Sequence, residues 1–412
     1  MKTKNLHIQG KYDMSDPNEL INRVAERSGQ MLIELTEQIN QQKKELQSHT
    51  YYQVYSKAAV AKLPQLSKAI VDKTVGEMEQ TGYTFAKRKA GSSEKYTMSI
   101  QNIADIYQHR NVPKYRSKHS TAFTIFLGNL KGGVSKTVST VSLAHGLRTH
   151  PHLLKEDLRI LVIDLDPQSS ATMFLNHTHA IGSIEETAAQ AMLQNVTREE
   201  LINEFIVHSG VPGVDVIPAS IEDAFIASRW ENLCEEYLPT HNRHRILRDN
   251  IIDKLQFDYD LIFIDSGPHL DPFLTNALAA SDLFMTPIPP AQVDFHSTLK
   301  YLNRLPELLD IIRDSGCSLQ VQGNIGFMSK LANKADHKLC HSLAKEIFGG
   351  DMLDVALPRL DGFERCGESF DTVISANPST YVGSNEALKS ARAAAEDFAK
   401  SVFDRIEFIR SN

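Results

Sequence analysis

The stretch GNLKGGVSKTVSTVSLAHGL, residues 128–147, decides the fold of this chain. It nearly spells the phosphate-binding loop G-x-x-x-x-G-K-[ST], but Ser135 replaces the glycine before Lys136, and Leu130 stands where the first glycine of that pattern falls. An apolar run, FTIFLGN at 123–129, precedes the loop, and good helix formers follow it. A strand, a glycine-rich loop and a helix in this order predict backbone N–H groups that cradle phosphates.

Similar apolar runs lie downstream and alternate with helical stretches, at residues 158–166, 214–219, 259–267 and 281–290. Near-continuous apolar strands separated by helices indicate a mostly parallel, doubly wound α/β sheet that is covered on both faces. We therefore expect a P-loop domain over residues 123–412. Its ligands should bind beyond the carboxyl ends of the strands.

The loop residues that we expect to bind the nucleotide are Gly132, Gly133, Val134, Ser135, Lys136, Thr137 and Val138. Lys136 would neutralise the outer phosphates, and the Thr137 hydroxyl would hold Mg²⁺.

Two other strands end in carboxylates. In VIDLDPQSSAT, Asp164 and Asp166 stand two apart, so one can reach a Mg²⁺-bound water and the other the attacking water. For this segment alone, an Asp-Pro turn with capping carboxylates is the alternative. Asp265 ends YDLIFIDSGPHLD in the form of a Walker B strand, and we expect it to hold Mg²⁺ through water.

The charge of the chain is unevenly distributed. Residues 51–120 hold twelve Lys or Arg against five Asp or Glu, whereas residues 1–50 hold seven of each. The net charge of the chain is −7, so the other 292 residues together carry −14. A basic module attached to an acidic one suggests that the first meets a polyanion. A solvated charged surface is the alternative.

Residues 51–108 read as a winged helix-turn-helix. A short helix ends near Leu63, a second begins at Ser67 and stops at Gly82, and two strand-like arms surround residues 90–92 as a β-wing. Candidate DNA contacts are Ser67, Lys68 and Lys73 on the second helix and Lys87, Arg88 and Lys89 on the wing, with Lys95 returning. A small helical packing domain is the alternative, and the polar, basic residues 109–122 form the expected linker.

A long helix is expected at residues 16–47, within an N-terminal segment 1–50. Asp16 would be its N-cap and Pro17 its first residue, and its apolar stripe comprises Leu20, Val24, Met31, Leu35, Ile39 and Leu46. This stripe would pair with a second copy of the helix, as a dimerisation helix, or pack on its own chain.

Length and composition exclude several classes. A chain of 412 residues exceeds what one hydrophobic core usually supports. The four cysteines show no metal-site spacing, which is typical of reduced cytosolic thiols. No apolar h-region and no run of about 18 apolar residues appears, so we expect no signal peptide, no membrane span and a cytoplasmic protein.

The loop form K-G-G-x-x-K-[ST] at 131–137, with its extra Lys131, resembles the ParA/MinD class of P-loop ATPases. Residues 121–412 resemble the ParA ATPase domain, and residues 1–120 resemble the N-terminal extension of the larger plasmid partition ATPases. The resemblance implies a dimer that sandwiches two nucleotides, with Lys131 reaching the partner's phosphates. It assigns Asp166 to the attacking water and Asp164 to the metal shell, and it places adenine between later loops, near Met328 and Pro358.

The sequence departs from the family pattern at two positions. Ser135 stands where glycine is frequent, which raises the question of the loop's backbone path, and Val138 stands where a second Thr is common.

The same resemblance implies a function. It is a DNA-partition ATPase that uses ATP and Mg²⁺, binds nucleoid DNA without sequence preference, represses its own operon and is stimulated by a ParB-type centromere-binding partner. Basic residues Arg365, Lys389 and Arg392 would form the second DNA site, with solvated helix charge as the alternative. A nucleotide-switched transcriptional regulator with little turnover is the alternative function.

Two related roles are less well supported. A MinD-like membrane role is disfavoured because SVFDRIEFIRSN is short and of mixed charge. A reductase like the nitrogenase iron protein needs paired cysteines at its dimer interface, and this sequence does not have them in the right place. Residues 167–250 contain an acidic helical segment to which the sequence assigns no function.

Overall fold

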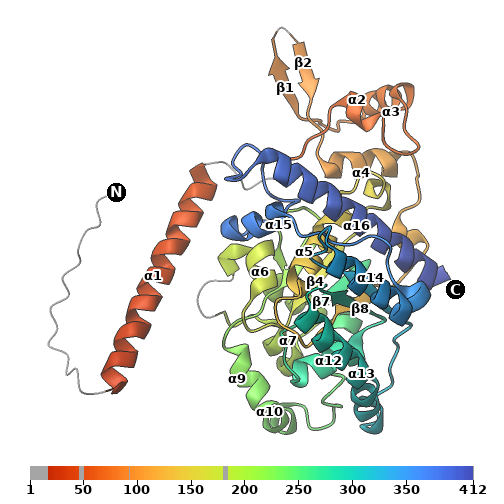
Figure 1. The fold of residues 1–412 in the computed structure, drawn as a ribbon. Helices are drawn as coiled ribbons and strands as arrows, with labels where there is room; N and C mark the ends of the chain where they lie inside the picture. Colours follow the sequence, from red (N-terminus) through yellow and green to blue (C-terminus); the bar gives the residue numbers. More distant parts are fainter. Residues whose placement is uncertain (1–16, 46–50, 92, 180–183, 412) are drawn as a thin grey trace. The chain divides into compact units, whose positions relative to one another are not determined.

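The computed structural model describes residues 17–45, 51–91, 93–179 and 184–411 (Figure 1). The chain divides into two compact units, Met1–Gln47 and Ser48–Asn412. Within these described ranges, no helix is long and apolar enough to cross a membrane. All four cysteines are buried and free.

In the first unit the structure describes the helix α1 (Pro17–Glu45), which confirms the long helix expected from the apolar spacing. The expected N-cap Asp16 and the stripe residue Leu46 lie outside the described residues. Val24, Met31 and Leu35 are exposed along α1, because the helix carries more apolar side chains than its own unit can bury.

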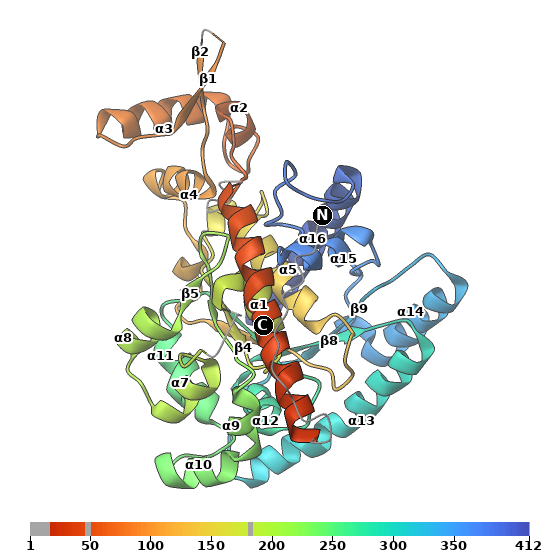
Figure 2. The same ribbon diagram turned by 90° about the vertical axis from the view of Figure 1, so that its left-hand side faces the viewer.

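The second unit begins with the predicted helix-turn-helix and wing. Its elements are α2 (Lys57–Val60), α3 (Lys68–Gln80), β1 (Lys87–Ala90), β2 (Ser93–Tyr96) and α4 (Ile100–His109). The Ser67 side chain caps α3 by accepting from Ile70 N at 3.4 Å, and Gly82, with φ +91°, lets the chain leave the helix. In Figure 2 the antiparallel hairpin of β1 and β2 stands beside α3.

Helix α4 was not expected from the sequence. A capping box starts it, because the Ser99 and Asn102 side chains each bond the other's backbone N–H. Ile103 and Ile106 bury the inner face of α4 against Val71 and Val75 of α3.

A seven-stranded sheet forms the rest of the unit, in the order β5-β6-β4-β7-β3-β8-β9. Its strands are β3 (Phe123–Leu127), β4 (Ile160–Asp164), β5 (Val207–His208), β6 (Val214–Ile217), β7 (Leu261–Asp265), β8 (Leu283–Ile288) and β9 (Asn324–Met328). Every pairing is parallel except that of β5 with β6, which confirms the mostly parallel sheet.

Helices cover both faces of this sheet. They are α5 (Lys136–Thr149), α6 (Ser170–Leu175), α7 (Ala188–Gln194), α8 (Arg198–Glu200), α9 (Asp223–Ser228), α10 (Trp230–Tyr237), α11 (Asp253–Leu255), α12 (Pro272–Ala280), α13 (Gln292–Asp314), α14 (Ala335–Phe348), α15 (Asp361–Cys366) and α16 (Asn385–Ser411). Alternate residues of β3 enter different cores: Ile125 packs in one with Val141 and Phe398, and Phe126 packs in the other with Phe273.

Helix α16 crosses α5 at close range. A Cβ atom on Gly146 would lie 2.8 Å from the Ala399 Cβ, so the two helices can touch only because Gly146 has no side chain.

The helix-turn-helix module and the seven-stranded sheet share one core, which runs from Val75 and Ile106 through Tyr115 to Phe123 and Val141. The predicted linker, 109–122, therefore connects the modules as packed chain, since Tyr115 is fully buried within it.

The polar residues at this junction are bonded as well. Buried Arg148, at the end of α5, donates to Asp157 at 2.9 Å and to Gln101 of α4 at 3.4 Å. Lys114 forms an ion pair of 2.7 Å with Asp157. Breaking a buried ion pair is costly, so these contacts fix α4 to the end of α5.

Candidate nucleotide site and DNA-binding module

The loop between β3 and α5 keeps a phosphate-cradling path despite its serine. Gly133 has φ +75°, and Ser135 has φ +74° and ψ 25°, so both are left-handed. Such a backbone is ordinary for glycine but strained for serine. The sequence therefore retains the loop geometry at the cost of local strain at Ser135.

Buried Asn129 holds the start of the loop. Its amide donates to Pro287 O at 3.0 Å and Thr298 Oγ1 at 2.9 Å, and its carbonyl accepts from Lys131 N at 2.9 Å. Sequence reasoning overlooked Asn129, because its partners come from distant segments.

Lys136 begins α5, and only 7 % of its surface is exposed. Its ammonium donates to Lys131 O at 3.2 Å. Burial lowers the pKa of Lys136, while the carboxylates of Asp265 and Asp166 oppose that shift. A buried ammonium at the mouth of a helix N-terminus is suited to a phosphate anion.

Asp265 ends β7 beside the loop. It accepts hydrogen bonds from Thr137 Oγ1 at 2.7 Å and Thr140 Oγ1 at 3.2 Å. Burial raises the pKa of Asp265 to about 6, because the charged carboxylate is out of water. Thr137 and Asp265 thus sit together as oxygen donors of the kind that Mg²⁺ takes alongside nucleotide phosphates.

Asp164 lies opposite Asp265 in the register of β4 and β7, but its oxygens are occupied. One accepts from Asp166 N at 3.1 Å, and the other from Thr172 N at 2.8 Å and Thr172 Oγ1 at 2.7 Å. Burial, and then the charge of Asp265, raise the pKa of Asp164 to about 8. Asp164 thereby braces the turn that carries Asp166, and its place in the metal shell stays a prediction.

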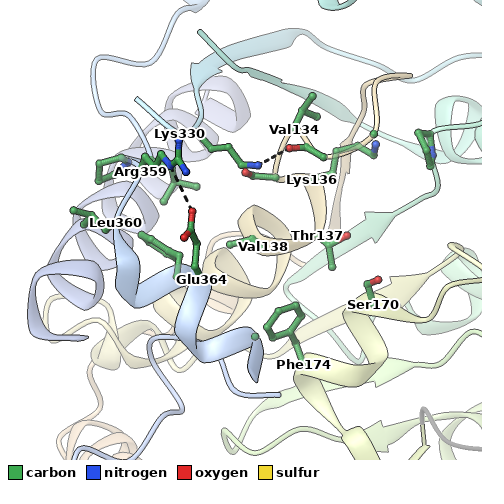
Figure 3. A pocket seen from close by; sticks show the side chains of 18 of the residues that line it. Val134, Lys136, Thr137, Val138, Ser170, Phe174, Lys330, Arg359, Leu360 and Glu364 are labelled. Carbon is green, nitrogen blue, oxygen red and sulfur yellow. Dashed lines mark hydrogen bonds and ion pairs between the residues drawn. The ribbon is translucent and has the colours of Figure 1, made fainter. Parts of the chain in front are cut away.

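A cavity of about 490 Å³ opens beside the loop (Figure 3). Residues 132–138 line it, together with Asp166, Pro268 and Pro358.

The far wall of the cavity is apolar and was missed by the sequence. Phe174 of α6, Leu360 just before α15 and Phe363 within α15 line it. Arg359 and Glu364 form an ion pair of 3.5 Å beside them (Figure 3). A flat apolar slot with a few polar groups is typical of a base-binding site.

Met328 was expected at this wall, and the structure contradicts that prediction. The residue belongs to β9, where it is paired with Ile288 in register and fully buried with Phe295 and Cys340. The segment NIGFMSK was expected to be a loop, but residues 324–328 form β9. Side chains alternate between the two faces of a strand, and the Met328 side chain points into the core.

Two lysines near the loop point to different places, Lys330 toward the cavity and Lys131 toward α13. Lys330 lines the cavity and donates to Gly133 O at 2.7 Å, although sequence reasoning did not single it out. Lys131 is not among the lining residues, and its ammonium lies 3.5 Å from Asp294 of α13. Within one chain, Lys131 therefore does not face its own cavity.

The expected DNA contacts on α3 and the wing are in different situations. Lys68, Arg88 and Lys89 are exposed, and the Lys73 side chain is 77 % exposed. The Ser67 hydroxyl is used as the α3 cap, and the Lys87 ammonium lies 2.9 Å from Glu79.

The C-terminal basic residues do not form one free patch. Lys389 is exposed on α16, and Arg365 is half-exposed with Glu368 at 3.7 Å. Arg392 instead donates to Val373 O at 3.0 Å and Ala376 O at 2.9 Å, and its guanidinium lies over the Tyr52 ring. The Arg392 guanidinium, expected in the second DNA site, is thus bonded within the chain.

The sheet topology, the loop with its buried lysine, and the Thr137–Asp265 pair define a P-loop ATPase that carries a helix-turn-helix DNA-binding domain. The family models agree: one described as the ParA helix turn helix domain matches residues 28–119, and one described as an AAA domain matches residues 122–315. The chain belongs to the plasmid partition protein A (ParA) family.

Individual relatives support that assignment. The chain is 70 % identical over 399 residues to plasmid partition protein A of Escherichia coli, covering 97 % of this chain and all of that one. It is 32 % identical over 186 residues to protein SopA of Escherichia coli K12, covering 43 % and 44 % of the two chains.

Solved structures give the same result. A partition protein superposes with a TM-score of 0.78 at 50 % identity, covering 96 % of this chain and all of that one. A cobyrinic acid a,c-diamide synthase from Mycobacterium smegmatis, solved with ADP and magnesium, shares the fold alone, with a TM-score of 0.50 at 17 % identity over 69 % of this chain and 96 % of its own.

Proposed function

We propose that the chain is a DNA-partition ATPase that works as a dimer, binds nucleoid DNA without sequence preference in its ATP state, and represses its own operon. The observation that carries the proposal is the cavity lined by buried Lys136, by Thr137, whose hydroxyl donates to Asp265 behind it, and by the apolar residues of the slot. These groups fit a Mg²⁺-nucleotide, since a buried ammonium at a helix N-terminus suits phosphate and the hydroxyl and carboxylate oxygens suit Mg²⁺.

Each residue has a proposed role in that reaction. The backbone of 132–138 and Lys136 bind the phosphates, and Pro358, Phe174 and Phe363 enclose the base. Thr137 and Asp265 would hold Mg²⁺, which neutralises phosphate charge when bound. Asp166 lines the cavity, where its carboxylate orients the attacking water and accepts a proton from it.

The dimer would complete the site. Lys131 does not line its own cavity, which supports a role at the partner's phosphates. The exposed stripe of α1, with Val24, Met31 and Leu35, supports a second contact between copies. Because Lys131 would meet the partner's phosphates across this interface, dimerisation would depend on the bound nucleotide.

Two DNA-binding modes follow from two surfaces. Helix α3 and the wing would read a palindromic operator, because a two-fold dimer presents two such modules. Exposed Lys389 and Arg365 would contact nucleoid DNA through phosphates alone. A ParB-type partner would stimulate hydrolysis, and the protein would be cytoplasmic and associated with the nucleoid.

Two observations favour a second function, a nucleotide-switched regulator with little or no turnover. Ser135 is strained, and Val138 lines the cavity without a hydroxyl for the phosphates. Nucleotide would then act on DNA binding only through α5, whose far end contacts α4.

Hydrolysis assays separate these functions. ATP turnover is measured for the wild type, Lys136→Ala and Asp166→Ala, with and without random-sequence DNA, and exposed Lys338→Ala serves as the matched control. A partition ATPase shows slow turnover that rises with DNA and is lost in both site variants but kept in the control. If turnover is absent and nucleotide still changes the affinity for a duplex that carries the promoter of its own gene, the regulator is established instead.

A further inference from the structure

The wing, formed by β1 and β2, is joined to α3 by a cluster of three side chains. These are Glu79 of α3, Lys87 of β1 and Tyr96 of β2, and we term the cluster the wing lock. Lys87 Nζ lies 2.9 Å from Glu79 Oε1, and the Tyr96 hydroxyl lies 3.1 Å from both Glu79 oxygens. One carboxylate at the end of α3 therefore holds both strands of the wing at their first cross-strand pair.

A second contact extends the lock to α2. The ammoniums of Lys57 and Lys87 each lie 4.6 Å from the centre of the Tyr96 ring. Lys57 also pairs with Asp72 of α3 at 3.1 Å. Cation–π contacts and hydrogen bonds to charged groups are individually modest, but here they converge on one ring and tie three elements together.

The wing needs such an anchor. Each of its strands has four residues, and an isolated two-stranded hairpin is marginally stable in water. Backbone bonding holds its base, where Thr97 N donates to Ala86 O at 2.9 Å and Tyr55 and Met98 exchange two hydrogen bonds of 2.8 Å. The wing lock adds a side-chain tie between the strands themselves and α3.

Lys87 also differs from the other basic residues of the wing. Its ammonium is engaged with Glu79 at 2.9 Å, although Lys87, like Arg88, Lys89 and Lys95, is exposed. The hydrogen bond between Lys87 and Glu79 raises the pKa of the lysine and lowers the pKa of the carboxyl, so both stay charged and paired.

We infer that Glu79, through Lys87 and Tyr96, sets the angle between the wing and α3, so that Lys87 is a positioning residue and the phosphate contacts of the wing fall to Arg88, Lys89 and Lys95. This inference rests in part on the proposed binding of operator DNA by the module. It makes an acidic residue necessary for binding a polyanion, which simple electrostatics would not predict.

The sign of one substitution tests the inference. The full chain is titrated with a labelled duplex carrying the promoter region of its own gene, comparing wild type, Glu79→Ala, Lys87→Met and the double variant. If the lock positions the wing, each single change weakens binding about three- to tenfold, and the double variant is no weaker than the worse single one, because the residues act as a unit. Glu94→Ala, which removes an exposed carboxylate of β2 outside the lock, is the control and binds as well or better.

The opposite pattern overturns the inference. If Lys87 contacts phosphate directly, Glu79→Ala tightens binding, Lys87→Met weakens it and lowers the slope of log K against log salt by about 0.9, and the two effects add.

A readout without DNA separates this inference from the proposed function. Amide hydrogen exchange of residues 87–96 is measured in the same free proteins. Faster exchange in Glu79→Ala than in Glu94→Ala supports the lock, and equal exchange overturns it. Wild-type protein that binds no promoter duplex, together with faster exchange in Glu79→Ala, refutes operator binding and leaves the lock standing.

Discussion

Ser135 carries a left-handed backbone that glycine would adopt freely, and its side chain makes no capping hydrogen bond in return. A left-handed L-residue costs roughly 1–2 kcal/mol, while glycine loses about 0.4–1 kcal/mol through the unfolded state. Ser135→Gly should therefore raise the free energy of unfolding by about 0.5–1 kcal/mol, measured with urea and without nucleotide.

The matched variant at this loop is Gly133→Ala. No atom lies within 4 Å of the new Cβ, so only the backbone conformation, φ +75°, opposes it. We expect a loss of about 1–2 kcal/mol. If Ser135→Gly destabilises the protein instead, the loop does not have this path.

Lys389 and Arg392 stand three apart on α16 and test how stability and DNA binding separate. Arg392→Ala removes two hydrogen bonds to backbone carbonyls and should cost about 2 kcal/mol of unfolding free energy. Lys389→Ala should leave stability within about 0.5 kcal/mol and lower the salt dependence of random-DNA binding by roughly one phosphate contact. Random-DNA binding that is unchanged in Lys389→Ala would remove this residue from the nonspecific site.

At the scale of elements, a histidine of α5 makes the free energy of unfolding depend on pH. His145 on its buried face lies 2.8 Å from Thr372 Oγ1 and 3.2 Å from Ser209 Oγ. Burial lowers the pKa of His145 to about 3, so the folded protein keeps it neutral while the unfolded chain takes up a proton below about 6.5. Stability is thus fully present above pH 6.5 and is lost as the pH falls toward the folded pKa.

The expected size follows from that linkage. Between pH 7.5 and pH 5 the wild type should lose about 2 kcal/mol more unfolding free energy than His145→Gln. Urea unfolding at several pH values measures this, with exposed His296→Gln as the control that tracks the wild type. Parallel curves for the wild type and His145→Gln would contradict the buried, neutral histidine.

Elements built from long apolar runs could be predicted, and those set by distant contacts could not. The runs of β3, β4, β7 and β8 were evident because both faces of each strand are buried. The edge strand β5 has two residues and no pattern to detect.

The candidate site divides in the same way. The phosphate end lies within consecutive residues 132–138, so the motif predicts it. The base end combines α6, α15 and Lys330 from three parts of the chain, and only tertiary structure brings Phe174 to Phe363. Arg392 and Lys87 were misjudged because a charged residue in a sequence shows no partner.

On the scale of the whole molecule, one core joins the DNA-binding module to the ATPase sheet. We predict that Mg²⁺-ADP, at about 100 times its Kd, adds roughly 2.7 kcal/mol of stability and slows amide exchange in α4 as well as in α5. Exchange measured with and without nucleotide checks this.

The control for this coupling is Arg148→Met, which removes the bonds from the end of α5 to Asp157 and Gln101. In that variant α5 should still be protected by nucleotide, while α4 no longer follows. Protection confined to α5 in the wild type would show that the shared core does not couple the modules.

The close crossing of Gly146 and Ala399 also bears on how the protein is made. Helix α5 leaves the ribosome early, yet the helix that covers it, α16, is synthesised roughly 250 residues later, on the order of 12–50 seconds at about 5–20 residues per second. During that interval the nascent chain displays the bare flank of α5 to the cell. Chaperone occupancy during translation, and the yield of active protein, should therefore depend on how fast α16 is delivered.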